Sequence, residues 1–258
     1  MTAPALSVVV PTLNEEGCIE AFLHEVSQYL ARHTASWEIV VVDDGSQDRT
    51  PELVEAFARR QPAVRLMRLA HRGKGAAIRQ GMLEARGAWR FMADADLSVT
   101  PDDWTVFLDA AYGPAAPDVI IGSREAPGSR RIGEPVSRHL IGRVFNFIVQ
   151  LLAVQGINDT QCGFKLLSAP AATAILPHLT LDGFAFDVEL LFLARRAGFT
   201  IREVGVVWTC RPDSRVRLSR GAAAFLDVVR IRVRQMTGRY AGVSRHAAAA
   251  STGMTRAS

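Results

Sequence analysis

Short runs of apolar residues alternate with segments of helical periodicity through the first 125 residues. The apolar runs, rich in valine and isoleucine, lie at residues 6–11, 37–44, 63–70, 89–96 and 118–124. The helical patterns between them cover about residues 15–32, 50–60, 75–86 and 101–111. Apolar runs without polar alternation are typical of strands covered on both faces, which occur in parallel sheets. The pattern therefore predicts an α/β fold with a doubly wound, mainly parallel central sheet.

The elements are less regular after residue 125. An apolar helix over about 138–154 is followed by a loop with the sequence GINDTQCGFKLLS, a helix over 186–198, a strand over 201–210 and a final helix over about 219–236. We expect a single domain over residues 1–240 and a small, polar, disordered tail at 241–258.

Acidic residues follow three of the predicted strands. Asp94 and Asp96 are spaced i, i+2, so in an extended segment their carboxylates point the same way, about 6–7 Å apart at the root. The segment from Pro11 to Glu15 and the pair Asp43 and Asp44 follow two other strands. Ligands of open α/β sheets bind outside the carboxyl ends of the strands, and we expect these acids to meet there. A cluster of carboxylates indicates a site for a divalent cation, a ribose or a base.

Each acidic motif also has a simpler interpretation. Asp43 and Asp44 precede Gly45 and are equally compatible with an Asx turn or a helix cap. A D-x-D pair is short and common, so Asp94 with Asp96 alone is weak evidence for a metal site. A dinucleotide site would need a glycine-rich phosphate turn after the first strand, and PTLNEEG is not such a turn.

Composition limits the classes of partner. The chain has 258 residues, 48% of them apolar, and a formal charge of +4, which together indicate a folded domain rather than a disordered one. Lys74 and Lys165 are the only lysines among 30 basic residues. Arginine binds phosphate bidentately, although compositional bias explains such usage equally well. Aromatic residues form only 7% of the chain and are not interleaved with basic ones, which argues against a nucleic-acid partner.

The location of the protein is expected to be cytoplasmic. Cys18, Cys162 and Cys210 have neither disulfide-like nor zinc-site spacing, which fits buried thiols in a reducing compartment. The amino-terminal residues lack the pattern of a signal peptide. No uninterrupted apolar span reaches about 18 residues, so we expect no transmembrane helix.

Four stretches follow one another at the predicted strand ends: VVVPTLNEE, IVVVDDGSQDRT, HRGKGAAIRQGMLEARG and FMADADLS. As an ordered set over residues 6–124 they resemble the nucleotide-sugar half of the family-2 glycosyltransferases, which have the GT-A fold. The resemblance implies that Pro11, Glu15 and Asp43 line the nucleoside pocket, with Asp44 beside it. It also implies that Arg72 and Lys74 approach the base or the diphosphate, and that Asp94 and Asp96 hold ribose, diphosphate and Mg²⁺ or Mn²⁺.

The remainder, about residues 125–218, resembles the acceptor half of enzymes that glycosylate a polyprenyl phosphate. The stretches DTQCGFK and FDVELL are most similar to those of dolichyl-phosphate β-glucosyltransferases and their bacterial relatives. The resemblance implies that Arg124, Arg138 and Arg215 contact the acceptor phosphate. Asp159 would orient Lys165 or an arginine, or act as base if the acceptor were a hydroxyl. A phosphate acceptor is already ionised at neutral pH and needs no strong base.

Several alternatives stay open at this point. Mannosyl-transferring relatives share the outline, and the sugar would be decided by loop geometry around Asp159 to Lys165 and Asp187 to Glu189. Asp43 could accept a hydrogen bond from uracil or from guanine, so UDP-glucose and GDP-mannose are both candidate donors. Relatives that use mannose often have glutamine where this chain has Ser98. A soluble hydroxyl acceptor, and a basic anion- or membrane-binding α/β protein without catalysis, are the remaining hypotheses.

The final predicted helix suggests how the chain would reach a lipid. Its residues Ala222, Leu226, Val229, Val233 and Met236 recur at helical spacing on one face, while Arg230 and Arg234 lie elsewhere. This pattern fits an amphipathic helix on an anionic membrane, and it equally fits a surface helix packed on the core. We expect peripheral contact with the inner face of the membrane.

Overall fold

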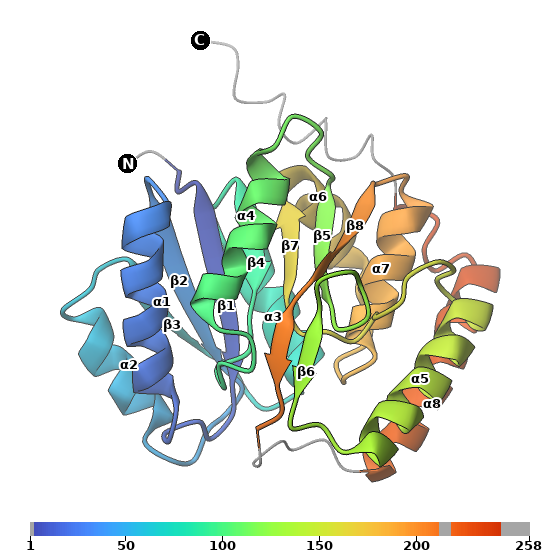
Figure 1. Ribbon diagram of the computed structural model, residues 1–258, viewed down its shortest axis with the longest axis horizontal. Coiled ribbons are helices and arrows are strands. Elements are labelled where there is room, and N and C mark those ends of the chain that lie inside the picture. Colours follow the sequence, from blue (N-terminus) through green and yellow to red (C-terminus); the bar gives the residue numbers. More distant parts are fainter. Residues whose placement is uncertain (1–2, 212–217, 244–258) are drawn as a thin grey trace.

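A seven-stranded sheet forms the centre of the computed structural model, which describes residues 3–211 and 218–243 (Figure 1). The strand order is β3-β2-β1-β4-β7-β5-β8. The strands are β1 (Leu6–Thr12), β2 (Trp37–Asp43), β3 (Val64–Arg68), β4 (Trp89–Met92), β5 (Val119–Ser123), β7 (Lys165–Ser168) and β8 (Ile201–Gly205). A separate two-stranded sheet pairs β6 (Arg130–Ile132) with β9 (Val207–Thr209). The predicted α/β architecture is confirmed.

Strand β7 departs from the sequence prediction. Its residues were expected to belong to a loop, but they pair antiparallel with both β4 and β5 in the middle of the sheet. The strand is only four residues long and is followed at once by helix α6 (Ala169–Ile175), so it carries little periodicity of its own. Because β7 runs against its neighbours, its first residue, Lys165, lies at the edge where β4 and β5 end.

Helices cover both faces of the sheet (Figure 1). One face packs against α1 (Ile19–His33), α2 (Thr50–Ala58) and α4 (Thr105–Tyr112), and the other against α3 (Lys74–Glu84), α6 and α7 (Phe186–Arg196). Val8 and Val10 of β1 belong to the first core, whereas Val9 belongs to the second. This alternation explains why the strand is apolar throughout, since both of its faces are buried.

The segment predicted as one strand over 201–210 forms two strands, β8 and β9. Gly205 ends β8, and a Cβ on it would lie 2.4 Å from the Pro127 carbonyl oxygen, a contact that only glycine allows. Val206 follows, and its N–H donates to Ser123. The next three residues then form β9 against β6. This break turns the chain away from the large sheet just beside the end of β5.

Two further helices, α5 (Val136–Leu152) and α8 (Leu218–Met236), lie side by side at the β8 end of the sheet (Figure 1). The 3₁₀ turns η1 (Pro101–Trp104) and η2 (Leu176–His178) precede α4 and follow α6. The expectation of a disordered tail from residue 241 is wrong for its first residues, because Val243 is buried in the core beside Tyr240. Residues 244–258 lie outside the described part of the chain.

The buried carboxylate of Glu38 in β2 links β1, β3 and the segment after α3. Glu38 is 2% exposed and accepts hydrogen bonds from the Ser7 hydroxyl (2.7 Å) and from the backbone and side chain of Arg86 (2.7 and 2.9 Å). Arg65 adds an ion pair at 3.3 Å. Burial alone would raise the pKa of Glu38, but these donors lower the pKa below its ordinary value. The ionised carboxylate therefore stabilises the fold.

This carboxylate predicts a pH-dependent loss of stability in the variant Glu38→Gln. Because the folded-state pKa is lowered, the stabilisation is present above the unfolded value of about 4.3 and is lost as pH falls through the folded value. We expect Glu38→Gln to lower the free energy of unfolding by about 3 kcal/mol at pH 7 and by clearly less near pH 3. Urea denaturation at both pH values measures this, with the exposed Glu25→Gln as control. An equal loss at both pH values would contradict the assignment.

Candidate active site

The predicted acids meet at one edge of the sheet. β1 pairs in parallel with β2 on one side and β4 on the other, so the segments that follow these strands emerge together. The pairing places Thr12 opposite Asp43, and the Asp44 N–H donates to the Thr12 carbonyl at 2.9 Å. The convergence predicted from the strand ends is therefore confirmed.

Asp43 and Asp44 have different surroundings. The buried Asp43 carboxylate accepts from the Ser46 N–H at 3.2 Å, as the turn interpretation expected. The Asp44 carboxylate instead accepts from the N–H groups of Arg72 and Gly73, both at 2.9 Å, and contacts His71 Nδ1 at 2.8 Å. Asp44 thus holds the loop that leads into α3.

The loop between β3 and α3 depends on two glycines. Gly73 has a φ of +124°, and a Cβ on it would lie 2.5 Å from the Asp182 carbonyl oxygen. A Cβ on Gly75 would lie 2.6 Å from the Leu181 carbonyl oxygen. The Arg72 guanidinium, predicted to approach the donor, pairs with Asp182 at 2.8 Å. These contacts dock the loop on the segment before α7 and fix the position of Lys74.

Lys74 and Asp94 form the central contact of the site. Lys74 Nζ lies 2.5 Å from Asp94 Oδ1, and both side chains are partly exposed. Burial alone would lower the pKa of Lys74, but the carboxylates of Asp94, Asp187 and Asp96 raise it, so the amine stays charged. The other oxygen of Asp94 faces Gly163, where a Cβ would lie 2.2 Å from it. Gly163 therefore leaves the space that the Asp94 carboxylate occupies.

Asp96 lies on a strained turn. Leu97, which follows it, has a φ of +53°, a conformation that a branched side chain rarely adopts. The turn brings the Ser98 N–H to 2.9 Å from Asp96 Oδ1. Strand β4 ends at Met92, so the D-x-D pair lies in the turn after the strand rather than in the extended segment that the sequence predicted, and this hydrogen bond fixes Asp96.

A buried ion pair lies behind these carboxylates. Lys165 is fully buried, and its Nζ donates to Asp187 Oδ1 at 2.5 Å and to the Cys162 carbonyl at 2.6 Å. Burial raises the pKa of Asp187, opposed by the positive charges of Lys165 and Lys74. Asp187 therefore contacts Lys165 directly and also feels the charge of Lys74. The prediction that Asp159 orients Lys165 is wrong, because Asp187 does so.

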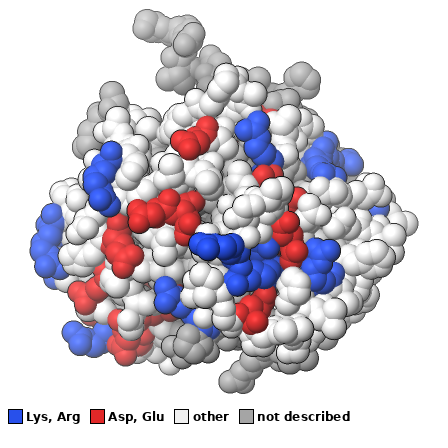
Figure 2. All heavy atoms as spheres, viewed as in Figure 1, with Lys and Arg blue, Asp and Glu red and all other residues white. Residues whose placement is uncertain are grey.

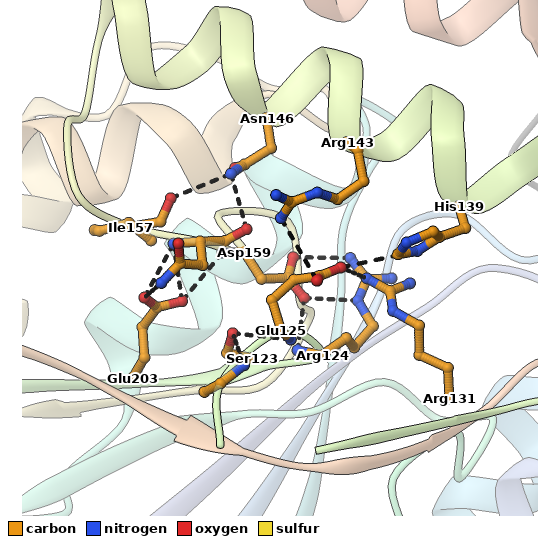
Figure 3. A network of polar contacts seen from close by, with 12 residues as sticks. Ser123, Arg124, Glu125, Arg131, His139, Arg143, Asn146, Ile157, Asp159 and Glu203 are labelled. Carbon is orange, nitrogen blue, oxygen red and sulfur yellow. Dashed lines mark hydrogen bonds and ion pairs between the residues drawn. The ribbon is translucent and has the colours of Figure 1, made fainter. Parts of the chain in front are cut away.

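Asp159 instead binds Arg124 (Figure 3). The Arg124 Nε and Nη2 atoms donate to the two Asp159 oxygens at 2.7 and 2.9 Å, and the Arg124 backbone N–H donates at 2.9 Å. The Arg124 guanidinium lies over the Trp208 ring, 5.4 Å from the ring centroid. Although burial opposes it, this arginine lowers the pKa of Asp159 to about 2. Asp159 is thus an orienting residue, as one predicted alternative held, and a poor general base.

The loop from Ile157 to Gly163 is fixed by α5 and β8 (Figure 3). Asn146 of α5 donates to the carbonyls of Ile157 (3.2 Å) and Asn158 (2.8 Å). Glu203 of β8 accepts from the N–H groups of Asn158 and Asp159, at 3.0 and 3.1 Å. The loop therefore connects α5 to Asp94 through Gly163. Neither Asn146 nor Glu203 carried a motif that sequence reading could recognise.

Beside this loop lies a second charge cluster that the sequence analysis missed (Figure 3). Arg131 of β6 pairs with Glu125 at 2.6 Å and with Glu134 at 2.5 Å. Arg143 of α5 lies 3.5 Å from Glu125, and His139 lies 3.8 Å from it. The cluster joins the segment after β5 to the start of α5.

The remaining predicted residues lie in several places. Glu189 is fully buried and accepts from the Leu181 N–H (2.8 Å), from Thr180 and from the Tyr240 hydroxyl (2.6 Å). It is a structural residue, and its predicted part in sugar recognition is not supported by these contacts. Pro11 pairs with Val42 at the end of β1, and the Glu15 N–H donates to Thr50. The side chain of Arg138, on α5, and all of Arg215 lie outside what the structure describes.

The residues at the predicted metal site supply only part of a metal ion's ligands. Among residues 3–211 and 218–243, no three His, Cys, Asp or Glu side chains are grouped to hold a metal ion. Asp94 and Asp96 supply two carboxylates, and Mg²⁺ commonly binds to one or two carboxylates while substrate phosphates and water complete its shell. The residues therefore fit a divalent ion that arrives with a diphosphate.

Comparison with known proteins gives a consistent result. The family model described as glycosyl transferase family 2 matches residues 7–176. Dolichyl-phosphate beta-glucosyltransferases from Dictyostelium discoideum and Homo sapiens are each 36% identical, over 90% of this chain and 75% and 76% of theirs. The enzyme of that name from Saccharomyces cerevisiae is 34% identical over 91% of this chain and 76% of its own.

The fold is shared with solved structures. Glucosyl-3-phosphoglycerate synthase from Mycobacterium tuberculosis, in complex with Mn²⁺, UDP-glucose and phosphoglyceric acid, superposes with a TM-score of 0.65 at 18% identity, over 92% of this chain and 80% of that one. This likeness confirms the GT-A fold. Together with the family match and the relatives, it shows that the chain is a glycosyltransferase of family 2.

Proposed function

We propose that the protein transfers glucose from UDP-glucose to a polyprenyl phosphate of the dolichyl type, with inversion at the anomeric carbon and with Mg²⁺ or Mn²⁺ bound. The observation that carries the choice of a phosphate acceptor is the ion pair of Asp159, whose two carboxylate oxygens accept from Arg124 at 2.7 and 2.9 Å, which makes Asp159 a poor base for a hydroxyl. A phosphate oxygen is ionised at neutral pH and attacks without one. The dolichyl-phosphate relatives support the same acceptor.

On the donor side, charge compensation is the main requirement. Asp94 and Asp96 would hold the divalent ion, which neutralises the diphosphate as the glycosidic bond breaks. Lys74 would exchange its contact with Asp94 for the donor diphosphate. Asp43, at the end of β2, would accept from the N3–H of uracil. Sequence similarity to glucosyltransferases favours UDP-glucose over GDP-mannose.

On the acceptor side, a phosphate oxygen would attack the anomeric carbon from the face opposite the leaving diphosphate. A bond forms between that oxygen and the carbon while the bond from the carbon to the diphosphate breaks, and UDP leaves with the electron pair. No proton transfer is needed for this step. Arg124, oriented by Asp159, together with Arg138 and Arg215, would hold the acceptor phosphate. Positioning therefore accounts for most of the catalysis on this side.

The location follows from the acceptor. A polyprenyl chain lies in a bilayer, so the enzyme would work as a peripheral protein at the cytoplasmic face of the membrane. None of the three cysteines forms a disulfide, and of the expected buried thiols Cys162 is buried whereas Cys18 and Cys210 are partly exposed. Within residues 3–211 and 218–243, no helix combines the length and the apolar character that a bilayer span requires.

A transfer assay tests the proposed function. Purified protein is incubated with Mg²⁺ or Mn²⁺, a short polyprenyl phosphate and either radiolabelled UDP-glucose or radiolabelled GDP-mannose, and the product is extracted into organic solvent. We expect label in the organic phase only with UDP-glucose. Label from GDP-mannose alone, or transfer only to a soluble hydroxyl acceptor, would overturn the proposal.

Replacing one carboxylate of the D-x-D pair tests the metal assignment. We expect Asp96→Asn to lower transfer at least about a hundredfold, because the developing diphosphate charge loses its counter-ion. Thermal unfolding should change little, since Asp96 is partly exposed. The exposed Asp102→Asn removes the same charge nearby and should keep wild-type activity. Normal turnover in Asp96→Asn would exclude the carboxylate from the metal site.

Adding one methyl group at Gly163 tests the link between the 157–163 loop and Asp94. A Cβ there would overlap the Asp94 carboxylate, so we expect Gly163→Ala to displace it and to lower kcat at least about tenfold. Gly142→Ala is the matched control, because a Cβ at that position of α5 meets nothing within 4 Å. Circular dichroism would show whether both variants keep the fold. Unchanged kcat in a folded Gly163→Ala would show that the position of Asp94 is not critical.

A further inference from the structure

Residues 179–182, which we call the 179–182 segment, support the start of helix α3. The segment forms neither helix nor strand. The Asp182 carbonyl accepts hydrogen bonds from the N–H groups of Gly75 (2.8 Å) and Ala76 (3.4 Å), both in the first turn of α3. Lys74 is the first residue of that helix. The position of Lys74 therefore depends on a segment that has no regular structure of its own.

The 179–182 segment is held in turn by Glu189 of α7. Acidic side chains are common on the surface (Figure 2), whereas Glu189 is fully buried. One carboxylate oxygen accepts from the N–H groups of Thr180 (2.9 Å) and Leu181 (2.8 Å). The other accepts from the hydroxyls of Thr180 and Tyr240, the latter at 2.6 Å, and lies 3.8 Å from Arg234 Nη1. Backbone groups outside regular structure need such partners, and one carboxylate supplies them for two consecutive residues.

Tyr240 is a fixed donor to this carboxylate. It lies in the turn after α8, and it is 1% exposed. Its ring packs against Phe192 of α7 with the ring centroids 5.8 Å apart, and its carbonyl accepts from Arg196 Nε at 3.1 Å. Burial and the nearby Glu189 carboxylate raise the pKa of Tyr240, so the hydroxyl keeps its proton. The carboxy-terminal turn is therefore connected to the 179–182 segment through a single buried carboxylate.

We propose that Glu189 and Tyr240 are positioning residues of the donor site, which set the location of Lys74 through the backbone of residues 180–182. This inference rests on the proposed function, in which Lys74 binds the donor diphosphate. Lys74 Nζ lies 2.5 Å from Asp94, so a small displacement of the first turn of α3 changes that contact. Binding of a diphosphate depends on such placement. Beyond supporting the fold, the carboxylate thus acts on the donor through the lysine.

A double-mutant cycle with Lys74 tests this role. UDP is titrated calorimetrically into the full chain in the presence of Mn²⁺. Tyr240→Phe with Thr180→Val removes both hydroxyls from Glu189 and leaves the side-chain shapes nearly unchanged. We expect this pair to weaken UDP binding at least about fivefold in the wild type. In a protein that also carries Lys74→Ala, the same pair should weaken binding less than about twofold, because the effect passes through the lysine.

The matched control is Tyr29→Phe with Thr105→Val. Tyr29 is 1% exposed, and its hydroxyl lies 3.0 Å from Thr105 Oγ1 on the face of the sheet that α1 and α4 cover. The control removes the same two chemical groups from the opposite face. We expect it to bind UDP like the wild type, although it also loses a hydrogen bond. Circular dichroism would show that all variants are folded at the temperature of the titration.

Three results would overturn the positioning role. They are unchanged UDP affinity in the folded Tyr240→Phe, Thr180→Val protein, an equal loss with and without the Lys74 side chain, and an equal loss in the control pair. A purely structural role would give one of these results, because it changes stability and not the affinity of the folded protein.

The outcome is separable from that of the proposed function. Coupling to Lys74 as expected, without transfer to polyprenyl phosphate, would support the positioning role and refute the proposed function. Transfer as proposed, without coupling, would do the reverse. GDP is titrated in parallel, so that binding of GDP in place of UDP by the wild type would refute the donor, and the cycle would then be measured with GDP. Absence of binding of both nucleotides by the wild type would overturn both proposals.

Discussion

Carboxylates brought together at one edge of a sheet repel one another unless basic side chains neutralise them. Most of the site depends on how this chain provides that neutralisation. Three ion pairs provide the neutralisation, and they join Lys74 with Asp94, Lys165 with Asp187, and Arg124 with Asp159. The Lys165–Asp187 pair is buried, and Asp159 is 5% exposed beside an Arg124 that is 18% exposed. The Lys74–Asp94 pair is the most exposed of the three, at 22% and 29%. Under the proposed function, this is the contact that the donor diphosphate would replace.

The Arg124–Asp159 pair is connected to Asp94 through the backbone of one loop. Asp159 is held by Arg124 and by Glu203, and the same loop continues to Gly163, against which the Asp94 carboxylate rests. A single loop therefore touches both the arginine side and the carboxylate side of the site. The separation of Asp159 from the Asp94 carboxylate is therefore limited by a short stretch of backbone.

The fold and the position of the acidic residues at the strand ends could be predicted because they depend on local patterns. Apolar runs indicated the parallel strands, and acids at their ends indicated the site edge. Strand β7 was missed because four residues carry almost no periodicity and its place is decided by pairing on both sides. The partners of Asp159, Lys165 and Glu189 were not predictable for a related reason. Each pairs with a residue distant in sequence, and spacing does not tell which buried charges meet.

The position of β7 also bears on how the two halves of the chain relate. Strand β4 precedes residue 125, but the side of β4 away from β1 is paired only when residues 165–168 form β7. Strand β5 pairs with the other side of β7. During synthesis, β4 and β5 are therefore joined in the sheet only after residues 165–168 have been made. The two halves are therefore not separable modules.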